Sequence, residues 1–169
     1  MPGYAATEYS EATAKLIHEF KERGQTELAK FFVSLMAPRL SGLGKSDAIL
    51  VAAPSGKVAS AKRGFQPAQV LAKQLGRQIG LPNLAALRPK FEVADQAALS
   101  RQQRLANLHH SLIASKALRG KRVILVDDIV TTGATLAEAK RAVEQVGGLP
   151  IFFATFAETI LKFEHLGPI

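Results

Sequence analysis

The first forty residues of the chain repeat apolar positions with the period of a helix. Residues 10–23 place apolar side chains on one face and charged side chains opposite, and Gly24 ends the pattern. A second helical pattern follows at 28–40. The apolar positions are Leu16, Ile17 and Phe20 in the first helix and Leu28, Phe31, Phe32, Leu35 and Leu40 in the second, and Glu11, Glu19 and Lys21 lie opposite the first set.

Beyond residue 47, short apolar runs alternate with helical patterns. The runs at 48–54, 122–128 and 150–159 predict buried strands, and 84–89 and 111–115 are shorter candidates. Helices are predicted at 67–80 and 135–148. Unbroken apolar strands that alternate with helices indicate a parallel sheet covered on both faces. We therefore predict an α/β fold in a single domain over 1–169, with a helical N-terminal lead at about 9–40 and a core at about 47–157.

Composition narrows the class of protein. Hydrophobic residues make up 47% of the chain, but no apolar run approaches the roughly 18 residues of a membrane span, and the N-terminus lacks the basic and apolar regions of a secretory signal. We therefore expect a cytoplasmic protein. The absence of Cys excludes disulfides and thiolate metal sites. The net charge of +8 favours an anionic partner, and nucleic acid, acidic lipid or a polyphosphate ligand would each fit.

The candidate chemistry lies in "RVILVDDIVTTGATLAEAK", residues 122–140. Asp127 and Asp128 follow the clearest strand, at the edge of a parallel sheet where ligands bind. The loop after them, 129–135, leads into a helix, whose first N–H groups suit a phosphate. Gly133 allows the backbone to approach an anion closely, and Thr131, Thr132 and Thr135 add hydroxyl donors. The loop is thus predicted to cradle a phosphate group.

Two adjacent carboxylates must meet something other than that phosphate. Sugar hydroxyls or a hard cation are their natural partners. A ligand with a phosphate, a ribose diol and a Mg²⁺-bound group would therefore give a partner both to the carboxylates and to the donors of the loop. A strand that ends in two aspartates before an N-cap threonine is the plain structural alternative. It accounts for the aspartates alone, but it gives no reason for the run of small, hydrogen-bonding residues that follows.

The string "VILVDDIVTTGAT", residues 123–135, resembles the signature of type I phosphoribosyltransferases, which bind phosphoribosyl pyrophosphate (PRPP). Three further stretches, "LIHEFKERGQ", "RGFQPAQVLAKQLG" and "DQAALSRQQRLANL", are similar to the ComF family, named for competence for DNA uptake and also labelled amidophosphoribosyltransferase-like. Together the similarity covers positions 9–157. The resemblance implies a Rossmann-like type I phosphoribosyltransferase core that binds PRPP and Mg²⁺.

The resemblance also implies roles for particular residues. Asp127 and Asp128 would engage the ribose hydroxyls and hold Mg²⁺, directly or indirectly, and the loop would hold the 5′-phosphate. In this fold a basic loop and a mobile hood, here 92–103, supply charge for the pyrophosphate. The 5′-phosphate set is Thr131, Thr132, Gly133, Ala134 and Thr135, and the pyrophosphate candidates are Lys57, Lys62 and Arg63 in the basic loop and Arg101 and Arg104 near the hood.

Two features depart from the family pattern. Many members carry an N-terminal zinc module rich in Cys, which this Cys-free chain is expected to lack. Many also have a "PVPLH"-like sequence after the first core strand, where this chain reads "APSGK", 53–57. Elsewhere, "GLGKS", 42–46, fails the P-loop pattern because it lacks the first glycine and precedes a strand, and the four His show no metal-ligand spacing.

Two functions stay open at this level. The first is a phosphoribosyltransferase that moves the phosphoribosyl group of PRPP to an unidentified nitrogen acceptor and releases pyrophosphate. The second is a non-catalytic, PRPP-responsive or DNA-uptake accessory protein whose basic surface contacts nucleic acid. With either function we expect that the protein can form a homodimer and does not contact a membrane.

Overall fold

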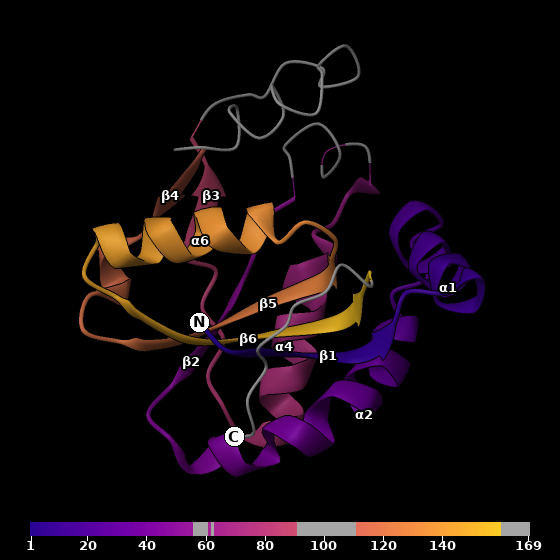
Figure 1. Ribbon diagram of the computed structural model, residues 1–169, viewed down its shortest axis with the longest axis horizontal. Helices are drawn as coiled ribbons and strands as arrows, with labels where there is room; N and C mark the ends of the chain where they lie inside the picture. The colour runs from indigo at the N-terminus through magenta and orange to yellow at the C-terminus, as the bar shows by residue number, and fades with distance from the viewer. Residues whose placement is uncertain (56–60, 62, 91–110, 160–169) are drawn as a thin grey trace.

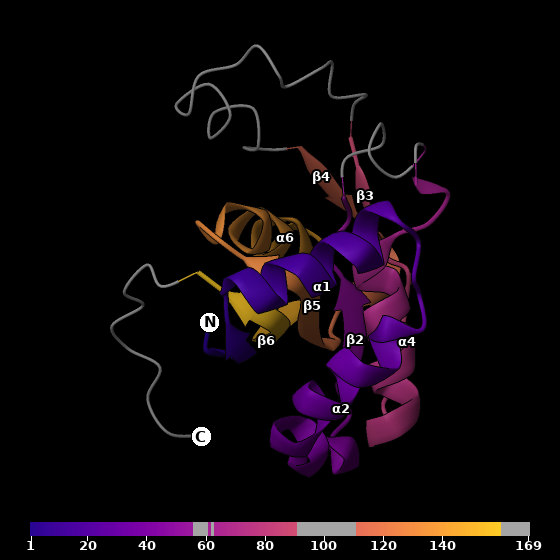
Figure 2. The same cartoon turned by 90° about the vertical axis from the view of Figure 1, so that its right-hand side faces the viewer.

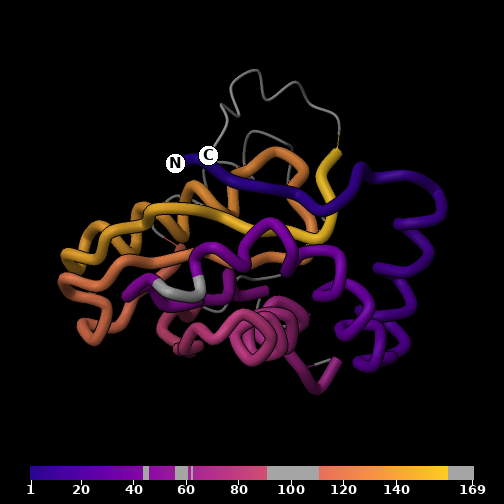
Figure 3. The backbone as a smooth tube through the Cα atoms, turned by 90° about the horizontal axis from the view of Figure 1, so that it is seen from below, coloured from indigo at the N-terminus to yellow at the C-terminus, as the bar shows by residue number. Residues whose placement is uncertain are grey.

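A parallel four-stranded sheet forms the centre of the protein, in a computed structural model that describes residues 1–55, 61, 63–90 and 111–159, apart from the side chains at 44 and 45. Its order is β1-β6-β5-β2. The strands are β1 (Gly3–Glu8), β2 (Ile49–Ala52), β5 (Arg122–Val130) and β6 (Leu149–Glu158). Figure 3 shows β1, β6 and β5 as neighbouring traces in that order. The predicted α/β fold with a mainly parallel sheet is confirmed.

Helices cover both faces of the sheet and one of its edges. In Figures 1 and 2, α6 lies on one face, α2 and α4 lie on the other, and α1 stands beyond the carboxyl ends of the strands. A separate antiparallel pair, β3 with β4, projects from the body of the protein on the side of α6. The bounds are α1 (Glu11–Glu22), α2 (Leu28–Leu40), η1 (Ser41–Lys45), α4 (Pro67–Ile79), β3 (Leu87–Pro89), β4 (Leu112–Ala114), η3 (Lys116–Leu118) and α6 (Ala134–Gln145).

Alternation along the strands explains why their sequences are apolar throughout. On β5, Ile124 and Val126 pack into the core under α2 and α4, whereas Val123 and Leu125 pack into the core under α6. Neighbouring side chains of a strand point to opposite faces, so a strand covered on both sides needs apolar residues at every position. The run stops being apolar at Asp127, although Asp128 and Val130 further along the strand are buried as well.

The buried face of α2 differs from the predicted face. Phe31 and Leu35 were expected in the core, but 47% and 41% of their surfaces are exposed. The helix offers two overlapping apolar rows, and packing selects the row that contains small residues, which allow close approach to a neighbouring helix. The buried row is Ala29, Phe32, Val33, Met36, Ala37 and Leu40.

The sheet is also larger at its edges than the sequence indicated. β1 precedes the helical lead and pairs with β6, although its sequence "GYAATE" has no long apolar run. Gly3 lies so close to the ring of Phe153 that a Cβ at Gly3 would be 2.1 Å from Cε1 of that ring. In addition, β5 runs to Val130 because β6 continues beside it, so the predicted loop 129–135 shortens to Thr131–Gly133.

Candidate functional site

The two carboxylates of the acidic pair, Asp127 and Asp128, follow the apolar run of β5, and their side chains interact with each other. Asp128 is buried, and its Oδ1 lies 2.8 Å from Nζ of Lys21 in the last turn of α1. The two neighbours in sequence therefore differ in burial, and Lys21 forms its ion pair with Asp128.

Asp127 is half-buried, and its acidity is strongly perturbed. Loss of hydration on burial, reinforced by the negative charge of Asp128, raises the pKa of Asp127 well above its usual range. Two effects oppose this rise: the backbone N–H of Asp128 donates to Oδ1 of Asp127 at 2.9 Å, and the charge of Lys21 is nearby. Asp127 is thus the member of the pair that most needs a cation or hydrogen-bond donors from elsewhere.

Lys21 corrects the predicted helix face. The sequence placed it opposite the apolar residues of the first helix, but it lies at the edge of the buried face, one turn after Ile17, with 22% of its side chain exposed. A lysine four residues from a buried position can extend its charged end along that face. The spacing of four residues from Ile17 therefore indicated that Lys21 could lie at the edge of the buried face. Nothing in the sequence, however, links Lys21 to an aspartate more than one hundred residues later.

The predicted phosphate loop is a tight turn that opens onto α6. Gly133 adopts a left-handed conformation with φ of 73° and forms the N-cap of the helix, where it has no side chain to accept from the first N–H groups. Thr132 Oγ1 accepts from the N–H of Ala134 at 3.3 Å, and the first turn of α6 has no acidic residue. Thr131 and Thr132 are exposed, while Gly133, Ala134 and Thr135 are half-buried. An anion could reach this helix end, whose dipole favours negative charge.

The end of β6 holds the loop in place. The N–H of Thr159 donates to the carbonyl of Val130 at 3.0 Å, and the Thr159 hydroxyl group donates to the carbonyl of Thr131 at 3.2 Å. On the neighbouring strand, Thr155 pairs with Asp127, and its hydroxyl group is buried without a hydrogen-bond partner among the described residues. Sequence reasoning missed Thr155, because one hydroxyl in an apolar strand carries no pattern.

Of the predicted pyrophosphate residues, the structure describes only Arg63. Its Nη2 and Nε atoms lie 2.6 and 3.0 Å from Oε1 of Glu22, the last residue of α1. Glu22 was not predicted as a site residue. Lys57, Lys62, Arg101, Arg104 and the hood at 92–103 lie outside the described residues. In the "APSGK" stretch, the N–H of Ser55 donates to Oε1 of Gln66 at 3.1 Å. The assignments to pyrophosphate stay predictions.

An ion pair between the half-buried Arg141 and the buried Glu138 ties the antiparallel pair β3–β4, here called the stem, to the helix behind the phosphate loop. Arg141 donates to both carboxylate oxygens of Glu138, at 2.7 and 2.8 Å, and to the carbonyl of Leu112 at 3.0 Å. Glu138 in turn accepts from the N–H of Leu112 at 3.0 Å. The hydrogen bond from Arg141 to Glu138 raises the pKa of Arg141. The stem therefore has a fixed position relative to α6.

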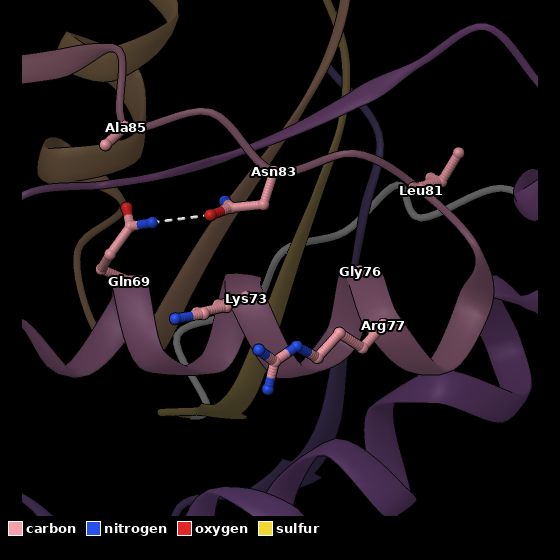
Figure 4. A pocket seen from close by; sticks show the side chains of 7 residues that line it. All are labelled: Gln69, Lys73, Gly76, Arg77, Leu81, Asn83 and Ala85. Atoms are coloured by element: carbon pink, nitrogen blue, oxygen red, sulfur yellow. Dashed lines mark hydrogen bonds between the residues drawn. The ribbon is translucent and has the colours of Figure 1, made fainter.

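A shallow hollow of about 460 Å³ lies away from this site, between α4 and the segment after it (Figure 4). Lys73 and Arg77, one helical turn apart, give it positive charge, and Gln69 donates to Asn83 across it at 2.6 Å. Neither carboxylate of the acidic pair lines it. The lining residues are Gln69, Lys73, Gly76, Arg77, Leu81, Asn83 and Ala85.

The side chains at the site can be compared with the ligands that Mg²⁺ prefers. The described part of the chain has no group of three or more His, Cys, Asp or Glu side chains that could share one ion. Mg²⁺ commonly binds through one or two carboxylates together with water and substrate phosphates. The acidic pair fits that mode with Asp127 as the main protein ligand, because Oδ1 of Asp128 already contacts Lys21.

Within the described helices, none is long and apolar enough to cross a membrane.

Comparison with known proteins shows which family and which relatives the chain resembles. Residues 58–162 match the phosphoribosyl transferase domain family. Competence protein F of Haemophilus influenzae is 28% identical over 149 residues, which cover 82% of this chain and 65% of that protein. The DNA utilization protein YhgH of Escherichia coli is 30% identical over 138 residues, which cover 78% of this chain and 60% of that protein. The chain thus spans less than two thirds of the length of both relatives.

Among solved structures, adenine phosphoribosyltransferase from Thermoanaerobacter pseudethanolicus superposes with a TM-score of 0.51. The superposition covers 80% of this chain and 71% of that one, at 17% sequence identity. At this level of identity the likeness extends to the fold alone.

Proposed function

Because the chain belongs to the phosphoribosyl transferase domain family, in the subgroup of competence protein F and its relatives, we propose that it binds PRPP with Mg²⁺ and transfers the phosphoribosyl group to a nitrogen acceptor. One observation supports this most directly. An acidic pair at the carboxyl edge of the sheet is followed within a few residues by a glycine turn that opens onto a helix N-terminus whose N-cap residue has no side chain. Carboxylates suit ribose hydroxyls, and the helix end suits the 5′-phosphate.

The proposed reaction exchanges one bond at C1 of the ribose for another. The bond from C1 to the pyrophosphate oxygen breaks, the acceptor nitrogen bonds to C1, and the acceptor loses a proton. Positive charge develops on the ribose in the transition state, and a carboxylate at Asp127 would stabilise it. Bound Mg²⁺ would supply positive charge to the leaving pyrophosphate. Asp128, fixed by Lys21, would hold a hydroxyl group, so that C1 keeps its orientation while the bonds change.

Calorimetric titration with PRPP, ribose-5-phosphate and pyrophosphate, each with Mg²⁺, tests the binding step. We expect PRPP and ribose-5-phosphate to bind, and Asp127→Asn to weaken both. A screen of ammonia, amines and nucleobases for pyrophosphate release then tests the transfer. Absence of PRPP binding would refute the proposal, whereas binding without turnover of any acceptor would leave the non-catalytic alternative.

That alternative, a PRPP-responsive accessory protein that contacts DNA, draws support from a second observation. The relatives' names refer to competence and DNA utilization, this chain carries a net charge of +8, and Lys73 and Arg77 place two cations on one exposed face of α4. Replacement of both by Gln should reduce salt-sensitive DNA binding and leave PRPP affinity unchanged. Equal DNA affinity of the variant and the wild-type protein would exclude this face.

A further inference from the structure

Lys21 lies beside the acidic pair, although it belongs to a helix outside the sheet. Figure 1 shows α1 beyond the carboxyl ends of β5, β6 and β1, at the same edge as the turn that leads into α6. From there Lys21 reaches Asp128 with an ion pair of 2.8 Å, and 4% of the aspartate side chain is exposed. The buried carboxylate of Asp128 thus takes its counter-ion from α1.

A contribution to the stability of the fold does not by itself explain the ion pair between Lys21 and Asp128. Burying two opposite charges costs hydration energy that their attraction roughly repays, and apolar pairs of similar size often stabilise a protein at least as well. A buried ion pair is better explained where one member must be held ionised and in one orientation. Asp128 is such a member, because it belongs to the acidic pair.

The geometry leaves Asp128 able to bind a ligand. The ion pair with Lys21 is made through Oδ1, and a carboxylate can accept several hydrogen bonds through its two oxygens. A lysine on Oδ1 restricts the side-chain torsion of Asp128 and so fixes the orientation of its carboxylate. It also offsets the charge of one of two adjacent carboxylates before any ligand arrives.

The last turn of α1 is itself held firmly. The helix begins with a capping box between Ser10 and Thr13, and the ring of Phe20 packs edge-on against Phe32 at a centroid distance of 5.3 Å. Phe20 also contacts Phe65, near the start of α4, at 5.8 Å. One residue beyond Lys21, Glu22 binds Arg63. The helix end is therefore fixed to the body of the protein and can act as a support.

We propose that Lys21 is a positioning residue of the ligand site: it fixes the orientation and charge balance of Asp128, through which it acts on the ribose hydroxyls. This inference rests on the proposed binding of PRPP. It makes α1 part of the site, in addition to the strand and turn that carry the signature.

Titration of ribose-5-phosphate and PRPP against Lys21→Met tests the role of Lys21. Met keeps most of the length of Lys without the charge. We expect both affinities to fall by the same factor, roughly tenfold or more, which is the scale seen when a group that orients a binding residue is removed. Lys21→Arg should restore most of the affinity. Lys15→Met, which removes an exposed lysine from the same helix, serves as the matched control and should bind both ligands like the wild-type protein.

A double-mutant cycle with Asp128→Asn then separates positioning from direct contact. If Lys21 acts through Asp128, Lys21→Met should weaken ribose-5-phosphate binding by less than about twofold in the Asp128→Asn background. An equal loss in both backgrounds would overturn the proposal, since Lys21 would then contact the ligand itself. Thermal unfolding of each variant verifies that it is folded.

The outcomes distinguish this inference from the proposed function. If the wild-type protein binds neither ligand, the proposed function fails and the inference fails with it. If the wild-type protein binds both ligands and Lys21→Met binds them equally well, only the inference fails.

Discussion

Thr155 pairs with Asp127 across the β5–β6 register, and its buried hydroxyl group has no hydrogen-bond partner among the described residues. A buried polar group without a partner costs free energy, so Thr155→Val, which keeps the shape and removes the hydroxyl, should raise the free energy of unfolding by about 1 kcal/mol. Urea denaturation measures this change. Thr155→Ser provides the control: it retains the hydroxyl, loses a methyl group and should be less stable than the wild-type protein.

Asp127→Asn should stabilise the protein in a manner that depends on pH. The pKa of Asp127 is raised in the folded state above its ordinary value of 3.8, so its contribution to stability is complete below that value and is lost as the pH rises through the folded-state pKa. Asn carries no charge to bury. The variant should therefore gain most at neutral pH and nothing near pH 3, roughly one unit below the ordinary range. A pH-independent difference in urea denaturation would contradict the assignment.

Asp128→Asn should act in the opposite direction to Asp127→Asn, although the two residues are adjacent. Its removal leaves Lys21 half-buried without a counter-ion. We expect a loss of about 1–3 kcal/mol at neutral pH, less than the value for a fully buried pair because part of Lys21 remains exposed. Chemical denaturation measures the loss, and a gain in stability would show that the ion pair does not persist in solution.

Gly133→Val should abolish binding of inorganic phosphate and ribose-5-phosphate. The left-handed φ of 73° disfavours a β-branched residue, and the added side chain would project at the helix end where the anion is expected. Gly120→Val is a matched control, because Gly120 has a similar φ of 70° and open space where a Cβ would lie. Phosphate titration should separate them, and equal losses would trace the effect to strain alone.

Glu138→Gln should loosen the stem β3–β4 from α6. The change removes the counter-ion of Arg141 and one charged acceptor for the N–H of Leu112. We expect a loss of about 1–3 kcal/mol and faster amide exchange at Leu112. Glu144→Gln, in the exposed pair with Lys140 on the same helix, should cost at most about 0.5 kcal/mol. Similar losses for both would contradict a special role for Glu138.

The sequence predicted the parts of the fold that depend on local pattern. Apolar runs identified β2, β5 and β6, and Pro67 and Gly80 bounded α4. The run of small residues after Asp128 located the glycine turn. Each of these features is determined within a dozen residues, where spacing and residue type are sufficient.

Features that depend on distant partners were missed. β1 forms because β6 lies beside it, and β5 reaches Val130 for the same reason. The choice of the Ala29 row over Phe31 and Leu35 depends on the helix packed against α2. The unequal surroundings of Asp127 and Asp128 depend on Lys21, which reaches them only in three dimensions. No pattern within one segment carries this information.

The stem has a consequence for how related proteins could diverge. The N–H of Lys90 donates to the carbonyl of Ser111 at 2.7 Å, so the chain leaves and re-enters the described fold at a single point. A loop closed at one pair of neighbours tolerates changes in length well, because doubling its length costs only about 0.6 kcal/mol in closure entropy. Inserts of different length and composition could therefore be exchanged at this point while the sheet and the acidic pair stay in place.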